Sequence, residues 1–435
     1  MIASINPFNG ETIRIYEEHS PPETQRRLGL SWNVFHQYRR TPFEERAAKL
    51  LRAAEILESE KRRFAEFMTG EMGKTISSAE AEVSKSALGC RYYANEGEKA
   101  LADVRIETGA SRSYVRFQPL GPVLAIMPWN FPFWQVFRFA APALMAGNTC
   151  LLKHASNVPG CALAIEEILL RAGFPEGVFQ TLLLEVDKVE ALIRDHRIAA
   201  VTLTGSEASG RAVASQAGSE IKKTVLELGG SDPFIVMPSA DLPEAIRTAV
   251  LARVVNYGQS CIAAKRFIIA DSIYETFERD FIAGMQALKI GDPMDRSTGI
   301  GPLANERIAA ALEKQVNRAA AAGAKILTGG SRVAGRRCTF QPTVLTGVPR
   351  DSEIFREEIF GPVAMLFRAR DAAEAIELAN DSPFGLGASV WTRDEMEQAQ
   401  FIDEIETGQV FVNAMVASDP RLPFGGVKRS GYGRD

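Results

Sequence analysis

The sequence is poor in cysteine and histidine, and it has no long apolar run. Five cysteines and four histidines are scattered over 435 residues without the spacing of a zinc site, so we expect no metal. An odd number of widely spaced cysteines in a large chain indicates free thiols in a reducing cytoplasm. No run approaches the roughly 18 apolar residues of a membrane span, and the first residues lack the features of a signal peptide. We therefore expect a cytoplasmic protein without a membrane partner.

An excess of charge of one sign is also missing. The chain has 54 acidic and 50 basic residues, well interspersed, for a net charge of −4. Without a block of Lys and Arg, nucleic acid is not an expected partner. Hydrophobic residues make up 46% and charged residues 24%, as in an ordinary globular protein. Because 435 residues exceed one typical core, two domains are expected.

Hydrophobic patterns divide the chain into a helical start and two α/β stretches. The first hundred residues read as mostly helical, with a capping box at Thr41-Pro42-Phe43-Glu44. Short apolar runs then alternate with helices such as residues 159–172, which predicts a parallel sheet with helices on both faces. A second α/β stretch starts near residue 229, with helices expected to begin at 241 and 273. Expected strands are residues 123–127, 149–153, 178–183, 199–203, 234–237, 266–270 and 387–391.

One cysteine stands in a polar, glycine-bearing loop. Cys261 closes the run Asn256-Tyr-Gly-Gln-Ser-Cys261, and Glu227 opens Glu-Leu-Gly-Gly earlier in the chain. A thiol and a carboxylate are the groups needed to form a thioester and then hydrolyse it. Taken alone, a free cysteine is more often a small buried apolar residue.

Two turns after expected strands carry polar groups, each with a plain structural alternative. In Pro128-Trp129-Asn130-Phe131-Pro132 the prolines fix the backbone around Asn130, whose amide can then donate to an oxyanion. The alternative is an Asn in a rigid turn. In Thr204-Gly205-Ser206 a strand runs into a helix whose first amides suit a pyrophosphate, although an ordinary turn also needs this glycine.

Three further segments are individually weak. Lys153 ends a strand and suits a ribose or phosphate, or is simply solvated, whereas His154 reads as an ordinary edge residue rather than a base. Glu358 and Phe360 suit the ribose and ring of a dinucleotide, or form a charged turn before a buried Phe. The Gly-rich run 423–431 suggests only a turn.

Together and in this order, the motifs resemble the aldehyde dehydrogenase superfamily over essentially the whole chain. The runs 222–234 and 417–419 resemble the short bacterial succinate-semialdehyde dehydrogenases within it. The resemblance implies a Rossmann-type cofactor domain, an α/β catalytic domain and a small oligomerisation sheet. The motifs that carry it are Asn6-Pro-Phe-Asn-Gly10, Pro128-Trp-Asn-Phe-Pro132, Thr204-Gly-Ser206, Glu227-Leu-Gly-Gly230, Gly258-Gln-Ser-Cys261, Glu357-Glu-Ile-Phe-Gly-Pro362 and Pro423-Phe-Gly-Gly426.

The resemblance also implies roles for single residues. Cys261 is the nucleophile, the Asn130 side chain and the Cys261 amide hold the oxyanion, and Glu227 is the base for the water that hydrolyses the thioester. NADP or NAD accepts the electrons, so no metal is required. The implied cofactor contacts are Trp129, Lys153, Ser156, Gly205, Ser206, Glu358 and Phe360.

Ser156 bears on the choice of cofactor. Many NAD-specific members of the family carry Glu at this position, where its charge repels a 2′-phosphate. A Ser with Lys153 nearby removes that repulsion, so we expect NADP to be accepted.

Arg138 is the expected contact for the substrate. It resembles the Arg with which succinate-semialdehyde dehydrogenases bind the distal carboxylate, and the alternative is an Arg satisfied on a helix face. Some members carry a second substrate Arg where this chain has Val255, and Arg253 or Arg421 are candidates to replace it. Phe133, Trp134 and Phe137 line a substrate tunnel or belong to the core.

The resemblance further predicts the domain boundaries. Residues 1–100 and 119–228 form the cofactor domain, 229–412 the catalytic domain, and 101–118 with 413–435 the oligomerisation segments. Family members continue for about one more helix and strand, so either the chain is cut short or assembly differs, and a homodimer or higher homo-oligomer is expected. Residues 111–118 alternate as in a strand with one covered face.

Three functions are consistent with the sequence. The first is oxidation of a small aldehyde to an acid, with succinic semialdehyde as the expected substrate. The second is a CoA-acylating dehydrogenase. Glu227 argues against it, because a base at this position favours hydrolysis by water. The third is a non-catalytic structural relative, which has no need for Cys261, Asn130 and Glu227 together.

Overall fold

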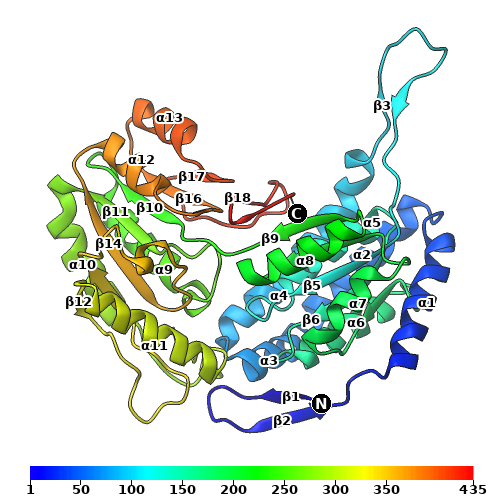
Figure 1. The fold of residues 1–435 in the computed structure, drawn as a ribbon, viewed down its shortest axis with the longest axis horizontal. Helices are drawn as coiled ribbons and strands as arrows, with labels where there is room; N and C mark the ends of the chain where they lie inside the picture. Colours follow the sequence, from blue (N-terminus) through cyan, green and yellow to red (C-terminus); the bar gives the residue numbers. More distant parts are fainter. Residues whose placement is uncertain (435) are drawn as a thin grey trace.

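The computed structural model describes residues 1–434 and has two lobes, each built around a β-sheet (Figure 1). The first sheet has six strands in the order β19-β9-β8-β5-β6-β7, parallel except for β19, which runs antiparallel to β9. Its strands are β5 (Pro122–Met127), β6 (Thr149–His154), β7 (Phe179–Thr181), β8 (Ala200–Thr204), β9 (Lys223–Glu227) and β19 (Gly431–Tyr432). The helices of this lobe are α1 (Pro21–Tyr38), α2 (Phe43–Ser59), α3 (Lys61–Met72), α4 (Ile76–Ala100), α5 (Trp134–Met145), α6 (Pro159–Arg171), α7 (Val189–Arg194) and α8 (Glu207–Ser219).

Both faces of this sheet are buried, as the uninterrupted apolar strands predict. Successive strand residues point to opposite faces, so β5 contributes Val123 and Ala125 to the core beneath α2 to α6. Leu124 between them packs into a separate core with α1, α7 and α8. The predicted parallel sheet with helices on both faces is confirmed.

The second sheet has seven strands in the order β12-β13-β14-β11-β10-β16-β17, all parallel except β12. Ile235 and Ile268 face one core, whereas Phe234 and Phe267 face another. Its strands are β10 (Pro233–Val236), β11 (Arg266–Ala270), β12 (Lys325–Thr328), β13 (Thr343–Thr346), β14 (Val363–Ala369), β16 (Ala388–Trp391) and β17 (Val410–Val412). Its helices are α9 (Leu242–Val254), α10 (Tyr274–Gln286), α11 (Glu306–Ala321), α12 (Ala372–Asn380) and α13 (Glu395–Glu404).

Each strand expected from the sequence is present within about two residues of its expected bounds. The capping box at Thr41 is wrong, because Pro42 is the N-cap of α2 and no side chain caps it. The sequence reading also missed the hairpin of β1 (Ile2–Ile5) and β2 (Thr12–Tyr16), and a small pairing of β15 (Phe384–Gly385) with β18 (Val427–Lys428).

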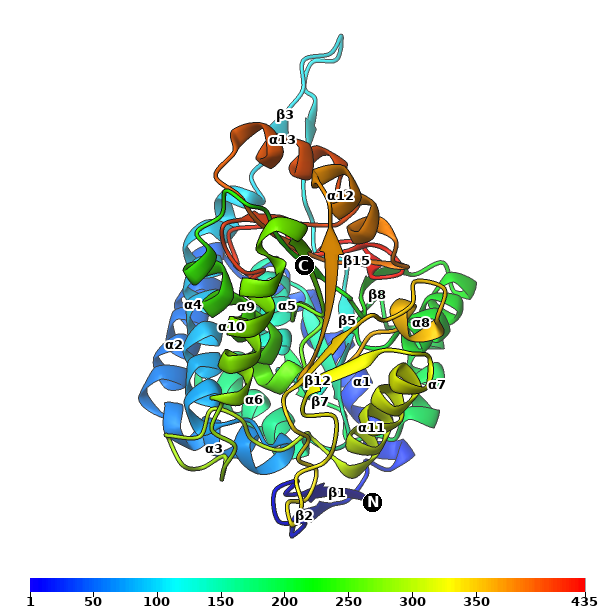
Figure 2. The same ribbon diagram turned by 90° about the vertical axis from the view of Figure 1, so that its left-hand side faces the viewer.

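A thin arm of β3 (Val104–Arg105) and β4 (Tyr114–Val115) projects from the body in both ribbon views (Figures 1 and 2). Tyr114, Val115 and Phe117 are all exposed, so neither face of this ribbon is covered within the chain. The alternation of residues 111–118 thus predicted a strand correctly at its centre, but no layer of this chain packs on it.

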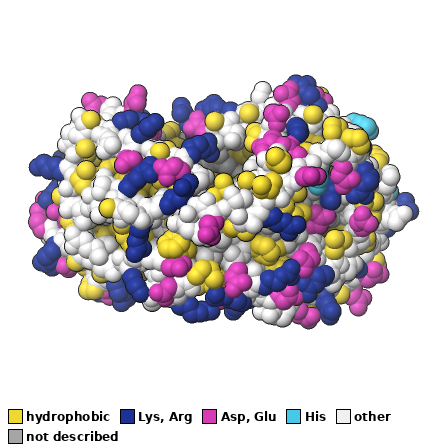
Figure 3. Space-filling view, turned by 90° about the horizontal axis from the view of Figure 1, so that it is seen from below, with side chains coloured by type: hydrophobic (Ala, Val, Ile, Leu, Met, Phe, Trp, Pro, Cys, Tyr) yellow, Lys and Arg dark blue, Asp and Glu magenta, His cyan; other side chains and the backbone are white. Residues whose placement is uncertain are grey.

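The face of the molecule in Figure 3 shows no field of one charge sign. Lys/Arg and Asp/Glu side chains are interspersed over the face in Figure 3. Among residues 1–434, no helix has both the length and the apolar composition needed to span a bilayer.

The chain passes from the first sheet to the second through Gly229 and Gly230. β9 ends at Glu227 in the first sheet, and β10 starts at Pro233 in the second. Near the C-terminus, β19 returns to the first sheet beside Glu227. The predicted domain limits stay a prediction, but this crossing places residues 227–232 between the two sheets.

Candidate active site

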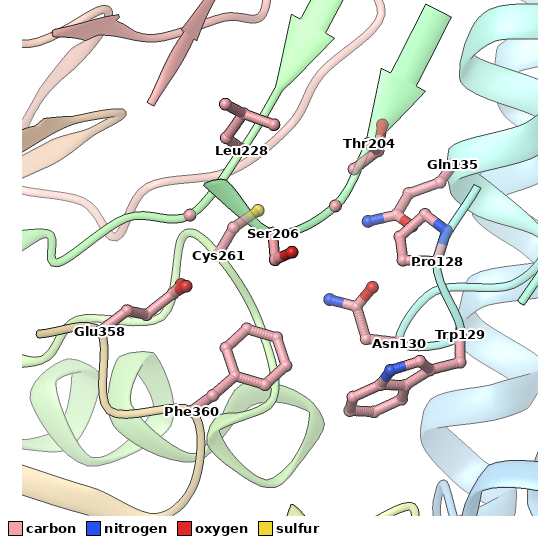
Figure 4. A pocket seen from close by; sticks show the side chains of 12 residues that line it. Pro128, Trp129, Asn130, Gln135, Thr204, Ser206, Leu228, Cys261, Glu358 and Phe360 are labelled. Carbon is pink, nitrogen blue, oxygen red and sulfur yellow. The ribbon is translucent and has the colours of Figure 1, made fainter. Parts of the chain in front are cut away.

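A cavity of about 270 Å³ lies where the loop before β11 faces the carboxyl ends of β5, β8 and β9 (Figure 4). Ligand sites of parallel α/β sheets form at this edge. The cavity brings together Cys261, Asn130 and nine other residues from the sequence motifs. Its lining comprises Pro128, Trp129, Asn130, Gln135, Thr204, Gly205, Ser206, Leu228, Gly229, Cys261, Glu358 and Phe360.

The Cys261 loop has an unusual backbone. Asn256, Tyr257 and Gly258 have φ values of 50°, 58° and 73°, and a left-handed conformation at a non-glycine residue costs about 1–3 kcal/mol. Two contacts hold it: Asn256 Nδ2 donates to the Asn130 carbonyl at 2.7 Å, and the Tyr257 hydroxyl accepts from Phe340 N at 2.9 Å. A Cβ at Gly258 would collide with the Gly361 carbonyl, so only glycine fits there.

Lys265 fixes the other side of the loop. Its side chain is fully buried, and Nζ donates to the carbonyls of Ser260 and Cys261 at 2.8 and 2.6 Å. The same Nζ lies 3.6 Å from Glu358 Oε1. Sequence reasoning missed this residue, although it stands only four positions after Cys261.

The thiol of Cys261 is partly exposed toward the cavity. Its surroundings are short of water, and this burial raises the pKa of Cys261 to about 12. The positive charge of Lys265 acts in the opposite direction and lowers that pKa, whereas the carboxylate of Glu358 raises it. The fraction of Cys261 that is ionised therefore depends on the charged side chains around the thiol.

Asn130 is buried with its amide at the cavity (Figure 4). One of its two N–H groups donates to the Gln259 carbonyl at 3.0 Å, which leaves the other for a ligand. Its Oδ1 has no hydrogen-bond partner among the described residues. The arrangement suits a donor to an oxyanion beside Cys261.

A buried ion pair lies behind Asn130. Lys74 pairs with Glu82 and donates to the Asn130 carbonyl at 2.9 Å. Glu82 Oε1 also accepts from the amides of Phe133 and Trp134, at 2.9 and 3.0 Å, at the start of α5. No local motif signals this pair, because its partners lie far from residue 130 in the sequence.

Two carboxylates occupy different places. Glu358 lines the cavity with Cys261, and its Oε1 accepts from Gly230 N at 3.0 Å (Figure 4). Glu227 is buried at the end of β9 and does not line the cavity, although Leu228 and Gly229 next to it do. Its backbone carbonyl accepts from Gly205 N at 2.9 Å, which ties it to the turn after β8.

The predicted cofactor residues fall into two groups. Trp129, Gly205, Ser206, Glu358 and Phe360 line the cavity, and the Trp129 and Phe360 rings meet edge to face with centroids 5.8 Å apart. Lys153 and Ser156 do not line it: Lys153 lies near the end of the neighbouring strand β6, and Ser156 follows that strand.

The ends of β6 and β8 flank β5, so Lys153 and Thr204 lie at the same edge of the sheet. Lys153 is only 4% exposed, and no hydrogen bond or ion pair joins its ammonium to any of residues 1–434. Burial lowers the Lys153 pKa, and the Glu185 charge raises it. A buried cation without a partner at this edge fits an anionic or hydroxyl-bearing ligand.

Ser156 and His154 differ in what they can offer. The Ser156 hydroxyl lies 3.5 Å from a Glu185 oxygen, so a carboxylate is present near this position after all. His154 is buried rather than at an edge, and its ring contacts the carbonyls of Met127 and Pro132. Burial lowers the His154 pKa to about 4, so it holds the turn after β5 as a neutral ring.

Arg138 lies on α5, one turn after Gln135. Its Nη2 is 3.4 Å from Thr204 Oγ1, and its guanidinium stands 4.5 Å from the centroid of the Phe424 ring. Arg138 is not in the cavity lining, but Thr204, which its Nη2 contacts, is. The Arg138 charge lowers the pKa of the Cys261 thiol.

The other candidate arginines lie elsewhere. Arg253 is fully buried and donates to the carbonyls of Gly258 and Val363, so it supports the Cys261 loop. Arg421 is exposed and paired with Asp419. Neither replaces the Arg that is absent at Val255. Of the aromatic candidates, Phe133 and Phe137 belong to the core.

Within residues 1–434, no group of three or more His, Cys, Asp or Glu side chains is placed to hold a metal ion.

Comparison with known proteins matches the whole chain to one family. The profile described as "Aldehyde dehydrogenase family" covers residues 1–435. The chain belongs to the aldehyde dehydrogenase family. The resemblance stated from the motifs is thereby confirmed, and the motif residues meet at one cavity because the fold brings the strand ends together.

Family members of similar sequence share nearly their full length with this chain. It is 55% identical to "Succinate-semialdehyde dehydrogenase [NADP(+)]" of Mycobacterium avium (strain 104), with 100% of this chain and 93% of the relative covered. It is also 55% identical to "Succinate-semialdehyde dehydrogenase [NADP(+)] 1" of Mycobacterium tuberculosis (strain ATCC 25618 / H37Rv), covering 100% and 96%. Among solved structures, a succinic semialdehyde dehydrogenase from Streptococcus pyogenes in complex with NADP+ matches with TM-score 0.97 and 36% identity, covering 100% and 96%.

Proposed function

We propose that this protein oxidises succinic semialdehyde to succinate with NADP, through a thioester on Cys261. The observation that carries the proposal is the convergence of the Cys261 thiol and the Asn130 amide on one cavity, with the Arg138 guanidinium 3.4 Å from Oγ1 of Thr204 in the cavity lining. The names of the similar relatives support both the substrate and the cofactor.

The chain's residues fit a dinucleotide. Lys153 offers a buried ammonium without a partner among residues 1–434, and Gly205 and Ser206 open α8, whose first amides suit a pyrophosphate. Trp129, Glu358 and Phe360 stand at the cavity for the nicotinamide ribose and ring. When bound, the nicotinamide accepts a hydride from the aldehyde carbon.

The thiolate of Cys261 attacks the aldehyde carbon and forms a carbon–sulfur bond. The carbonyl oxygen then carries the negative charge, and the free N–H of Asn130 donates to it. Because Asn130 is held by Lys74, Asn256 and Gln259, this donor needs little reorganisation.

As the hydride leaves the carbon attached to sulfur, the oxyanion re-forms the C=O double bond, and the acyl group remains on Cys261 as a thioester. Water then hydrolyses this thioester. Glu227 takes the proton of the attacking water, and the carbon–sulfur bond breaks to release the acid and the thiol. Glu227 does not line the cavity, although Leu228 next to it does, so its side chain has to move toward the cavity to act.

A kinetic comparison tests the proposal. We expect kcat/KM for succinic semialdehyde to exceed that for butanal, which has the same number of carbons but no carboxylate, by about tenfold or more. We also expect NADP to be preferred over NAD. Equal or better use of butanal would overturn the substrate, and a hundredfold preference for NAD would overturn the cofactor. Turnover only upon addition of CoA would replace hydrolysis by CoA acylation.

Location and assembly are part of the proposal. Five free cysteines suit a reducing cytoplasm. The exposed β3–β4 arm, with Val104, Val115 and Phe117, suits a contact in a homodimer. Sedimentation of the full chain tests this, and a monomer at micromolar concentration would contradict it.

A further inference from the structure

α4 brings a second cation toward the substrate side of the site. Lys85 is half-buried on this helix, with its ammonium 4.5 Å from the centroid of the Trp134 ring on α5. The Trp134 ring also packs against Gly89, one turn later on α4. The ammonium makes no hydrogen bond or ion pair with any residue in the described part of the chain.

The carboxylates near Lys85 are already engaged. Glu82 pairs with Lys74 and accepts from two backbone amides at the start of α5. Asp419 accepts from both ends of the Arg421 guanidinium, at 2.8 and 2.6 Å. Neither lies within ion-pair distance of Lys85.

Arg138 connects Lys85 with the nucleophile. Trp134, whose ring contacts the Lys85 ammonium, and Arg138 stand four residues apart on α5, so their side chains lie on the same face of this helix. The Arg138 guanidinium reaches Thr204 in the cavity lining, and its charge lowers the pKa of both the Cys261 thiol and the Lys85 ammonium. Burial, followed by Arg138, lowers the Lys85 pKa to about 8. A partly buried ammonium such as that of Lys85 is stabilised when a ligand brings a carboxylate to it.

We propose that Lys85 and Arg138 together bind the distal carboxylate of the substrate. This inference rests on the proposed function and adds a specificity residue to it. It accounts for the absence of an arginine at Val255, since Arg253 and Arg421 are engaged elsewhere. The chemical class is an aldehyde with a carboxylate at the far end of a short chain.

Substitution of Lys85 tests the assignment. In Lys85→Met we expect kcat/KM for succinic semialdehyde to fall by about ten- to hundredfold, the size expected for one charge-assisted hydrogen bond. The value for butanal should change less than about threefold, which also shows that the variant is folded. Lys85→Arg should recover most of the loss. Lys99→Met on the same helix, where the side chain is 75% exposed, is the matched control and should change neither substrate.

A measurement on the unmodified enzyme gives a second test. The ratio of kcat/KM for succinic semialdehyde to that for butanal should fall as the pH rises through about 8, because the neutral amine no longer attracts the carboxylate. In Lys85→Arg this fall should disappear. The charged groups that face Lys85 are Arg138 on α5, Glu82 on α4, Asp419 near the C-terminus and Lys74 before α4.

The outcomes separate the two proposals. If the unmodified enzyme prefers succinic semialdehyde and Lys85→Met keeps that preference, the Lys85 assignment is overturned while the proposed function stands. If the unmodified enzyme shows no preference for the carboxylated aldehyde, the proposed substrate and the Lys85 assignment both fail.

Discussion

Backbone carbonyls of the Cys261 loop are hydrogen-bonded within the chain, whereas, in the part of the chain that the structure describes, the ammonium groups of Lys85 and Lys153 are not. In the loop, Lys265 and Asn256 donate to backbone carbonyls. Lys85 is half-buried and Lys153 is buried, yet neither ammonium has a hydrogen bond or ion pair with any of residues 1–434. Groups paired within the chain hold positions, whereas unpaired groups near a cavity are completed by a ligand. The comparison therefore separates residues that position the nucleophile from residues that bind.

The largest effect on catalysis is expected for substitution of Glu227, the proposed base. Glu227→Gln removes the base for hydrolysis, so kcat should fall by about 10²–10⁴-fold while the first turnover still produces NADPH in a rapid burst. Stopped-flow absorbance measures the burst and the steady rate. Glu358→Gln is the matched control, and a lasting burst there but not in Glu227→Gln would assign the base to Glu358 instead.

The next effect concerns the oxyanion donor. Asn130→Ala should lower kcat by about 10²–10³-fold, as removal of one preorganised donor does in acyl transfer. The unfolding free energy should fall by only about 1 kcal/mol, because Lys74 and Asn256 bond the backbone of residue 130 rather than its side chain. Steady-state kinetics and chemical denaturation measure the two quantities. A loss of activity matched by a collapse of stability would make Asn130 structural.

Lys265 is hydrogen-bonded to the Cys261 loop, so its substitution should change both the stability of this loop and the pKa of the Cys261 thiol. Lys265→Met removes the cation that lowers the Cys261 pKa, so alkylation of the thiol by iodoacetamide at a fixed pH should slow by about tenfold, one pKa unit. The loss of two hydrogen bonds to carbonyls should also lower the unfolding free energy by about 1–3 kcal/mol. The exposed Lys314→Met serves as control. An unchanged pH profile of alkylation would remove Lys265 from the electrostatics of the thiol.

The smallest kinetic effect is expected for substitution of Ser156, a predicted cofactor contact that follows β6. Ser156→Glu places a second carboxylate near Glu185, which should lower kcat/KM for NADP by about tenfold and leave NAD nearly unchanged. Ser156→Ala, which adds no charge, is the control. Equal losses for both cofactors would show that position 156 does not face the 2′-phosphate.

Much of the fold follows from local patterns, as the strands and the motif residues of the cavity show. Val123 to Met127 and Phe267 to Ala270 are continuous apolar runs, and continuous apolar strands predict a buried parallel sheet. Because parallel strands end at one edge, the motifs after β5, β8 and β9 meet without any further information.

What the sequence did not predict depends on distant partners. Lys74, Glu82 and Lys85 stand in a helical region without a motif, and only the packing of α4 on α5 brings them to Asn130 and Trp134. Glu185, which contacts Ser156, is likewise remote in the chain. The capping box failed because the pattern alone does not fix which residue takes the N-cap.

The thioester on Cys261 is the central claim, and rapid-quench mass spectrometry tests it most directly. Glu227→Gln is mixed with succinic semialdehyde and NADP and quenched in acid within one turnover, and the peptide that contains Cys261 is weighed. The account predicts that this peptide gains the mass of one acyl group in step with NADPH formation and that Cys261→Ser gains none. NADPH formation with the Cys261 peptide unmodified would contradict it.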